Sequence, residues 1–141
     1  MRNKTVLLVD DEQPILQSLG NYLERKSFYV KPAISGEDAL AEFRSTTSFD
    51  LVITDLVMAG ISGLEVLKEI KKTNHETGVF ILTGHGNMSL AIEALRSGAD
   101  DFLLKPCDAD ELIFKMKSFF EKQEALRKIP ADMYVLQKNQ R

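Results

Sequence analysis

Five short apolar runs alternate with five segments of helical periodicity, and this alternation limits the folds that the chain can adopt. The runs are too short for buried helices, so they predict strands at 5–9, 28–30, 49–55, 78–83 and 101–105. Strands that alternate with amphipathic helices form a parallel sheet with helices on both faces and right-handed crossovers. The sequence therefore predicts a doubly wound α/β fold of five strand–helix units.

The run at 49–55 has the composition of a central strand. Leu51, Val52 and Ile53 are consecutive apolar residues, which is typical of a parallel strand buried on both faces. The run ends on a carboxylate, Asp55. Ligands of open α/β sheets bind beyond the carboxyl ends of the strands, so Asp55 is the first candidate for chemistry.

Residues that begin or end the elements make further predictions about the fold. Pro32 closes the second run and favours an edge position, because proline cannot donate to a central ladder. Ser62 and Glu65 form a capping box that starts the third helix, and Gly98 is a candidate C′ residue. The fourth helix is predicted to be capped by Asn87 and to bury Leu90, Ala91, Ala94 and Leu95.

Length, charge and cysteine content exclude several classes of protein. A length of 141 residues fits one domain, and a net charge of -3 gives no sign of a nucleic-acid-binding surface. The single cysteine, Cys107, cannot form an internal disulfide, fits a reducing compartment and is expected to be inert. The first apolar run is too short for a signal peptide or a membrane span, so we expect a cytoplasmic protein that contacts no membrane.

Carboxylates follow two of the predicted strands. Asp10 and Asp11 follow the first strand, and Asp55 ends the third. In a doubly wound sheet of order 2-1-3-4-5 these strands are neighbours at the switch point, so the three side chains share one crevice. Three ionised acids repel one another unless a cation lies between them, and Mg²⁺ suits such oxygen ligands. The sequence thus predicts a magnesium site.

Two more polar residues end the fourth and fifth predicted strands. Thr83 offers a hydroxyl donor, and Lys105 offers a point charge suited to phosphate. An acceptor carboxylate, a metal site, a hydroxyl and a lysine are components of phosphoryl transfer. Each residue alone has an ordinary explanation as a helix cap, a turn residue, a strand residue or a solvated lysine. Their joint placement at four strand ends favours one shared site.

Together these residues resemble the receiver domain of two-component response regulators. The resemblance covers roughly residues 4–122 and implies a flavodoxin-like fold, a parallel sheet of five strands in the order 2-1-3-4-5. It rests on Asp10-Asp11-Glu12, Asp55, Thr83 and Lys105-Pro106, in this order along the chain.

The resemblance implies how the acidic residues work. Asp55 would accept a phosphoryl group from a phosphohistidine on a partner kinase. Asp11, Asp55 and the backbone carbonyl of Val57 would bind Mg²⁺. Asp10 would act on the same metal through a bound water.

The resemblance also implies roles for the later residues. Thr83 and Lys105 would hold the phosphoryl oxygens, and Phe102 would be the aromatic residue that turns inward as Thr83 moves. The Lys105-Pro106 bond would be a cis peptide bond that aims the lysine into the site.

Two positions depart from the family's pattern. Ala59 stands where proline is common, which should loosen the loop after Asp55 without removing a chemical group. Gly84 follows Thr83 where the family often has alanine or serine, which should make that loop more mobile.

The last helical pattern continues beyond the resembling region. Apolar residues recur at helical spacing from Leu112 to Ile129, and Pro130 stops the pattern. We therefore expect an extended helix and tail at 123–141 that links a receiver at 4–122 to an output domain.

The predicted function is a phosphorylation-activated signalling switch. A sensor histidine kinase or a phosphotransfer protein would load Asp55. The surface of the fourth helix, fifth strand and fifth helix would then change its preference for an output domain or a partner protein. The domain would catalyse only its own phosphorylation and slow dephosphorylation. A phosphorylation-dependent homodimer remains open, and no contact with nucleic acid is expected from this segment.

Two other functions stay open at this point. The first is a Mg²⁺-dependent phosphohydrolase of the haloacid dehalogenase type, which places a second acid two residues after its nucleophile. Val57 occupies that position here and argues against this function. The second is a phosphate-independent, receiver-like interaction module, and the complete set of acids, hydroxyl and lysine argues against it.

Overall fold

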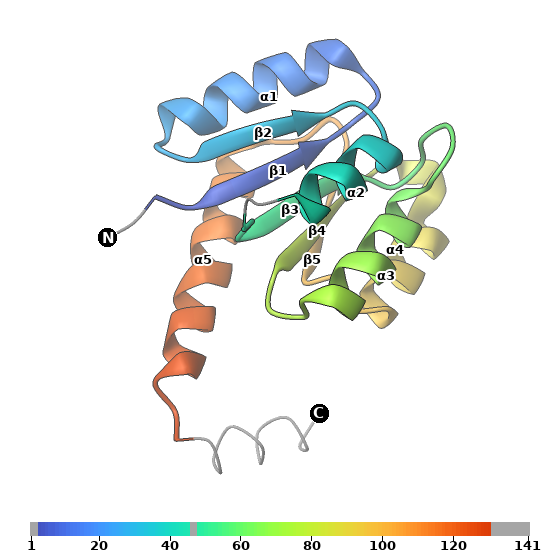
Figure 1. The fold of residues 1–141 in the computed structure, drawn as a ribbon. Helices are drawn as coiled ribbons and strands as arrows, with labels where there is room; N and C mark the ends of the chain where they lie inside the picture. The colour runs from blue at the N-terminus through green and yellow to red at the C-terminus, as the bar shows by residue number, and fades with distance from the viewer. Residues whose placement is uncertain (1–2, 46–47, 131–141) are drawn as a thin grey trace.

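The computed structural model describes residues 3–45 and 48–130, which form one parallel sheet with helices on both faces (Figure 1). Five strands lie in the order β2-β1-β3-β4-β5, and every neighbouring pair is parallel. This confirms the predicted flavodoxin-like fold and its strand order. The strands are β1 (Thr5–Val9), β2 (Tyr29–Ala33), β3 (Leu51–Asp55), β4 (Gly78–Thr83) and β5 (Asp101–Leu104).

The helices divide between the two faces of the sheet. Alternate residues of a strand point to opposite faces, so Val6 and Leu8 pack with α1 and α5. Leu7 and Val9 pack on the other side, in the core under α2, α3 and α4. The helices are α1 (Gln13–Arg25), α2 (Gly36–Arg44), α3 (Gly63–Thr73), α4 (Met88–Arg96) and α5 (Ala109–Arg127), with a short 3-10 helix η1 (His85–Asn87) before α4.

The edge position of β2 was predicted correctly, but its bounds were not. The strand begins one residue later than predicted and runs through Pro32 to Ala33. Pro32 lies opposite Leu8 of β1, and within the described part of the chain β2 has a neighbour on that side only. An outer edge needs no N–H donor, so proline is tolerated inside this strand.

The third and fourth helices differ from each other in how they begin. Ser62 and Glu65 form the predicted capping box of α3. Asn87 makes no side-chain cap at α4, which corrects the prediction for that residue. Instead η1 leads directly into α4, so the chain is already helical where the cap was expected.

Predicted burial in α4 was half wrong. Ala91 and Ala94 are buried, but Leu90 and Leu95 are 39% and 37% exposed. The helix lies close to the sheet along its alanine stripe, so its leucines point to the flanks. Gly98 after the helix has φ +113, as a C′ glycine requires.

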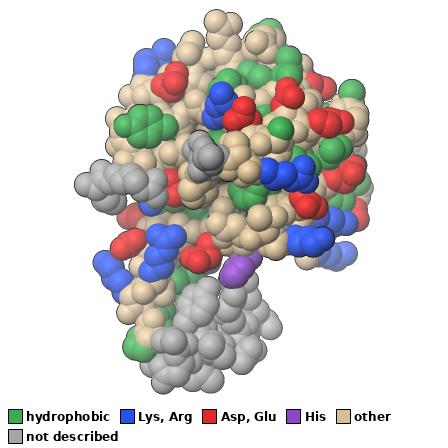
Figure 2. Space-filling model, viewed as in Figure 1, with side chains coloured by type: hydrophobic (Ala, Val, Ile, Leu, Met, Phe, Trp, Pro, Cys, Tyr) green, Lys and Arg blue, Asp and Glu red, His purple; other side chains and the backbone are tan. Residues whose placement is uncertain are grey.

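The last helix, α5, runs past the edge of the sheet (Figure 1). It ends at Arg127 with Lys128 as its C-cap, slightly before the predicted end at Ile129. The predicted tail at 131–141 lies outside the described residues. No helix among residues 3–45 and 48–130 has both the length and the apolar character that a membrane crossing demands. Acidic and basic side chains alternate over the face in Figure 2, without a large area of one sign.

Candidate functional site

Three carboxylates meet where β1 and β3 end. One ligand oxygen each from Asp10, Asp11 and Asp55 lies within 4.8 Å of the others. Asp10 and Asp11 directly follow β1, and Asp55 is the last residue of β3. The two strands are neighbours in the sheet, so their parallel pairing brings these side chains together. Asp10 and Asp55 are buried, whereas Asp11 is exposed to solvent.

Lys105 enters the same crevice from the loop after β5. Its Nζ atom lies 2.8 Å from Asp10 Oδ2 and 3.2 Å from Asp55 Oδ2, while Glu12 is more distant at 4.0 Å. The Lys105-Pro106 peptide bond is cis. The ion pair with Asp10 was not predicted. The signal that could have found it is that both residues follow strands at the same end of the sheet.

The hydrogen bonds of the Asp10 carboxylate indicate whether the site suits a metal ion. Its Oδ1 atom accepts a hydrogen bond of 2.9 Å from the Glu12 N–H. Its Oδ2 atom is buried and accepts no well-aligned hydrogen bond from a described residue, although the Lys105 ammonium lies beside it. A buried carboxylate oxygen with free lone pairs, next to two more carboxylates, fits a hard divalent cation.

The crevice changes the acid–base properties of its residues. Burial raises the pKa of Asp55 above its ordinary value, although the Lys105 charge and hydrogen bond act in the opposite direction. Burial alone would lower the pKa of Lys105, but the contact with Asp10 and the charge of Asp55 raise it overall. Lys105 is therefore a cation at neutral pH and counters part of the carboxylate charge.

Two glycines and an acid shape the loop between β3 and α3. A Cβ atom on Gly63 would clash with the backbone oxygen of Asp55, so only glycine fits there. Gly60 has φ +78, and Glu37 of α2 accepts a hydrogen bond of 3.4 Å from the Ile61 N–H. The Val57 side chain within this loop is 52% exposed. These contacts hold the loop without the proline that the family commonly has at Ala59.

Thr83 is the last residue of β4, and Phe102 lies on the neighbouring strand β5. Thr83 is fully buried, and its hydroxyl donates to the Gly84 carbonyl at 3.3 Å instead of to Asp55. Phe102 is half-buried and packs against the core below α2, α3 and α4. Ile81, two residues before Thr83, pairs with Phe102 across the sheet. A change at the end of β4 is therefore close to Phe102.

Cys107 is a poor nucleophile in this setting. Burial, followed by the charges of Glu111 and Asp108, raises the pKa of its thiol to about 11. The thiolate is the reactive form of cysteine, so the expectation of an inert thiol is supported. The side chain of His85, the first residue of η1, is exposed to solvent.

A flavodoxin-like sheet with three carboxylates and a lysine at its switch point defines the class of receiver-like α/β domains. Comparison with protein families then gives the family itself. The model of the response regulator receiver domain matches residues 6–117. The chain belongs to the response regulator receiver domain family.

Individual relatives agree with this assignment. The chain is 41% identical over 107 residues to the transcriptional regulatory protein ZraR of Salmonella typhimurium. The aligned region covers 76% of this chain and 24% of ZraR. It is 35% identical over 111 residues to the acid tolerance regulatory protein ActR of Rhizobium meliloti, covering 79% of this chain and 57% of ActR. The chain thus spans about a quarter to somewhat over half of these relatives.

Solved structures show the same similarity. A response regulator receiver domain protein from Clostridium thermocellum has a TM-score of 0.82 and 37% identity, over 87% of this chain and 98% of that one. NtrX from Brucella abortus has a TM-score of 0.83 and 33% identity, over 90% of this chain but 29% of its own. The similarity covers the complete receiver domain in the first case and one part of a longer chain in the second.

Proposed function

We propose that this receiver is a switch that is turned on by phosphorylation of Asp55. The observation that carries the proposal is the position of the Asp55 carboxylate, beside the Asp10–Asp11 pair and 3.2 Å from Lys105. Receiver domains of two-component systems interact with histidine kinases. The phosphoryl donor would be the phosphohistidine of a sensor histidine kinase or of a phosphotransfer protein.

The transfer would exchange one bond to phosphorus for another. A carboxylate oxygen of Asp55 forms the new P–O bond while the P–N bond of the phosphohistidine breaks. The electron pair of that bond returns to the imidazole nitrogen. Lys105 then faces the added negative charge, and the Thr83 hydroxyl can turn from Gly84 to donate to a phosphoryl oxygen.

Asp10, Asp11, Asp55 and the backbone carbonyl of Val57 would hold Mg²⁺. When bound, Mg²⁺ neutralises charge on the carboxylates and on the phosphoryl oxygens. The buried Asp10 Oδ2 atom, which accepts no well-aligned hydrogen bond from a described residue, supports this assignment. Asp11 can reach the same space, because its carboxylate oxygen lies within 4.8 Å of those of Asp10 and Asp55.

The switch would pass from the crevice to the surface of α4, β5 and α5. If Thr83 moves toward the phosphoryl group, it vacates space beside β5, and Phe102 can turn inward to fill it. The states must differ in their contacts with the phosphoryl group, since only differential binding shifts a conformational equilibrium. The changed surface would then select an output domain, a partner protein or a second copy of the chain.

We also propose the domain division suggested by the sequence. Residues 4–122 would be the receiver, and 123–141 would be the end of α5 and a linker to an output domain. The short share of ZraR that this chain covers supports such an arrangement.

Phosphorylation by a small donor tests the central claim. Incubation of the chain with Mg²⁺ and acetyl phosphate should add one phosphoryl group, detected as a mass increase of the intact protein. Asp55→Asn should lose this label, because the amide is not a nucleophile. Asp38→Asn, an exposed aspartate of α2, should keep it.

Stoichiometric labelling of Asp55→Asn would disprove Asp55 as the acceptor. Turnover of small phosphate esters by the unmodified chain would instead favour the phosphohydrolase. Failure of Mg²⁺ to bind at all would favour a phosphate-independent interaction module.

A further inference from the structure

The loop between β3 and α3 bends at residues 59–61. Gly60 has φ +78, and the third residue of a type II turn has φ of about +80°. In a closed turn of that type, the Ile61 N–H would donate to the carbonyl of Met58. Within the described part of the chain, this N–H instead donates to Oε2 of Glu37, in the first turn of α2, at 3.4 Å. A side chain from another helix thus takes the place of the usual backbone acceptor.

Two glycines make room for this contact between α2 and the loop. A Cβ atom on Gly60 would lie 2.6 Å from Glu37 Oε2. A Cβ atom on Gly36, the first residue of α2, would lie 2.6 Å from the Ile61 carbonyl oxygen. The first turn of α2 therefore lies directly against the backbone of the bend.

The other hydrogen bonds of the loop lie at its two ends. At the strand end, the Leu56 N–H donates to a carbonyl of β4 at 3.0 Å, and at the helix end the Gly63 N–H donates to the Leu56 carbonyl at 2.9 Å. The Met58 side chain is buried, but residues 59 and 60 are exposed. Among the described residues, Glu37 therefore supplies the polar contact to the bend itself.

We propose that Glu37 is a positioning residue for the magnesium site. This role rests on the proposed function, in which the backbone carbonyl of Val57 is a ligand of the ion. The Val57 side chain is 52% exposed, so its own packing does little to orient this peptide group. The direction of the carbonyl depends instead on the backbone at both sides. By closing the bend, Glu37 restricts that direction before the ion binds, and such preorganisation raises affinity.

The composition of the bend explains why it needs a contact from outside the loop. Gly60 permits the positive φ but leaves many other conformations open to the backbone. Ala59 occupies the second position, where proline would fix φ near about −65° and favour the turn. Neither residue restrains the bend by itself. Glu37 can supply the restraint from α2, where the helix N-terminus also suits its negative charge.

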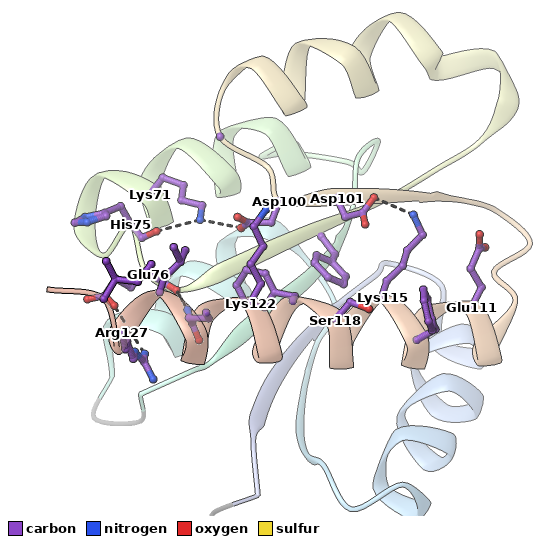
Figure 3. A pocket seen from close by; sticks show the side chains of 17 residues that line it. Lys71, His75, Glu76, Asp100, Asp101, Glu111, Lys115, Ser118, Lys122 and Arg127 are labelled. Atoms are coloured by element: carbon purple, nitrogen blue, oxygen red, sulfur yellow. Dashed lines mark hydrogen bonds and ion pairs between the residues drawn. The ribbon is translucent and has the colours of Figure 1, made fainter. Parts of the chain in front are cut away.

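A second loop of the chain is held in a similar way, at the opposite end of the sheet. Lys71, near the end of α3, lines a groove along α5 (Figure 3). Its Nζ atom donates to the backbone oxygens of His75 at 3.2 Å and Thr77 at 2.8 Å, and to Asp100 at 2.9 Å. This loop precedes β4, whereas the carboxylates meet beyond the other ends of the strands. Lys71 therefore offers a control, a side chain that restrains a loop without a metal ligand.

Calorimetric titration of the full chain with MgCl₂ measures the expected effect. Glu37→Ala should weaken Mg²⁺ binding on the order of 10-fold, the low end of what outer-shell partners of metal ligands contribute. Glu37→Gln should bind nearly normally, because its Oε1 atom can still accept from the Ile61 N–H. Asp38→Ala removes the same charge from the same turn of α2 and should leave the affinity unchanged. Equal weakening by Glu37→Gln or Asp38→Ala would show that charge alone acts, and would refute the positioning role.

Proline at position 59 provides a rescue. Ala59→Pro should restore most of the affinity lost in Glu37→Ala, because it restricts the same bend from within the loop. The Ala59 N–H donates no hydrogen bond to the backbone of a described residue, so the change removes none of these. In the unmodified chain Ala59→Pro should have a smaller effect, since Glu37 already closes the bend. An equal gain in both backgrounds would mean that the two positions act independently, which contradicts the proposal.

Amide hydrogen exchange tests the hold on the bend without the metal. In the metal-free chain, the Ile61 amide should exchange faster in Glu37→Ala than in the unmodified chain. The Ala39 amide, which donates to the Ser35 carbonyl within α2, should be unaffected. Equal acceleration at both amides would mean that α2 itself frays, and the specific contact would then be ruled out.

Lys71→Ala guards against a general effect of loosening the fold. It should lower stability toward urea without lowering Mg²⁺ affinity, and a matching loss of affinity would overturn the specific role of Glu37. If the unmodified chain binds Mg²⁺ and Glu37→Ala binds it equally well, Glu37 is not a positioning residue, although the metal site stands. If the unmodified chain binds no Mg²⁺, the metal site is absent and both proposals fail.

Discussion

The two sides of the acidic crevice differ in how tightly they are packed. On one side every residue of β3 is buried, and α3 starts with a capping box and buries Val66, Leu67 and Ile70. On the other side α4 starts without a side-chain cap and buries only small residues, Ala91 and Ala94. Only one residue of β5 is fully buried.

Because of this difference, one side of the crevice is expected to stay fixed and the other to move. The well-packed β3–α3 side fixes Asp55 and the loop that carries Val57. The α4–β5 side has less apolar contact, and regions of this kind open at lower free energy. The proposed switch would need both: an acceptor that stays in place and a neighbouring element that can move.

Truncation of one isoleucine on each side gives the largest contrast. Ile70→Ala in α3 removes a side chain with 0% exposure and should lower the free energy of unfolding by about 2–5 kcal/mol. Ile92→Ala in α4, 45% exposed, should change it by no more than about 0.5 kcal/mol. Urea denaturation measures both values. Equal losses would mean that the two sides are packed alike.

The reactivity of Cys107 should report how often the β5–α5 loop opens. Its pKa of about 11, against an ordinary 9.0, means that the folded chain binds this proton more tightly. Below pH 9 the folded thiolate is thus reduced by roughly 100-fold, at a factor of ten per pKa unit. Alkylation should be slower than in urea-unfolded chain, with the rate rising toward pH 11. A folded chain that reacts as fast as the unfolded one would show that the loop is already open.

Adding a methyl group to a glycine should affect the stability of the two loops beside the crevice to different extents. Gly63→Ala places its Cβ against the Asp55 backbone oxygen and should cost about 1–3 kcal/mol of stability. It should also weaken Mg²⁺ binding, measured by the rise in melting temperature that the ion produces. Gly86→Ala in η1 would place a Cβ that no described residue beyond its chain neighbours approaches within 4 Å, so this change should be close to neutral. A stable Gly63→Ala with unchanged Mg²⁺ binding would contradict the tight loop.

The alternation of strands and helices predicted the parallel sheet from the residues, whereas the strand order came from the resemblance to receiver domains. The unbroken apolar run at Leu51 and the alternating helices determine a parallel sheet. Boundaries were harder, since Pro32 is excluded from a central strand but not from an outer edge. The α4 leucines misled the burial prediction, because a periodic apolar stripe does not tell how close a helix lies to its sheet.

The residues of the site were predictable, but not all of their contacts were. The meeting of Asp10, Asp11 and Asp55 follows from the strand order that the resemblance to receiver domains implies. The Lys105–Asp10 contact and the Thr83 hydrogen bond to Gly84 depend on side-chain rotamers, which a sequence pattern does not specify. The close approach of Gly63 to Asp55 was missed for a similar reason, since it depends on the path of the loop.

The position of Lys105 sets a charge balance for the crevice. At their formal charges, the three carboxylates and the one ammonium leave two negative charges in the crevice. One divalent cation restores electroneutrality, whereas one sodium or potassium ion leaves half of the excess. If the proposed metal site is correct, the number of charged side chains favours a doubly charged ion, and replacing Lys105 by a neutral residue would alter which ions bind there.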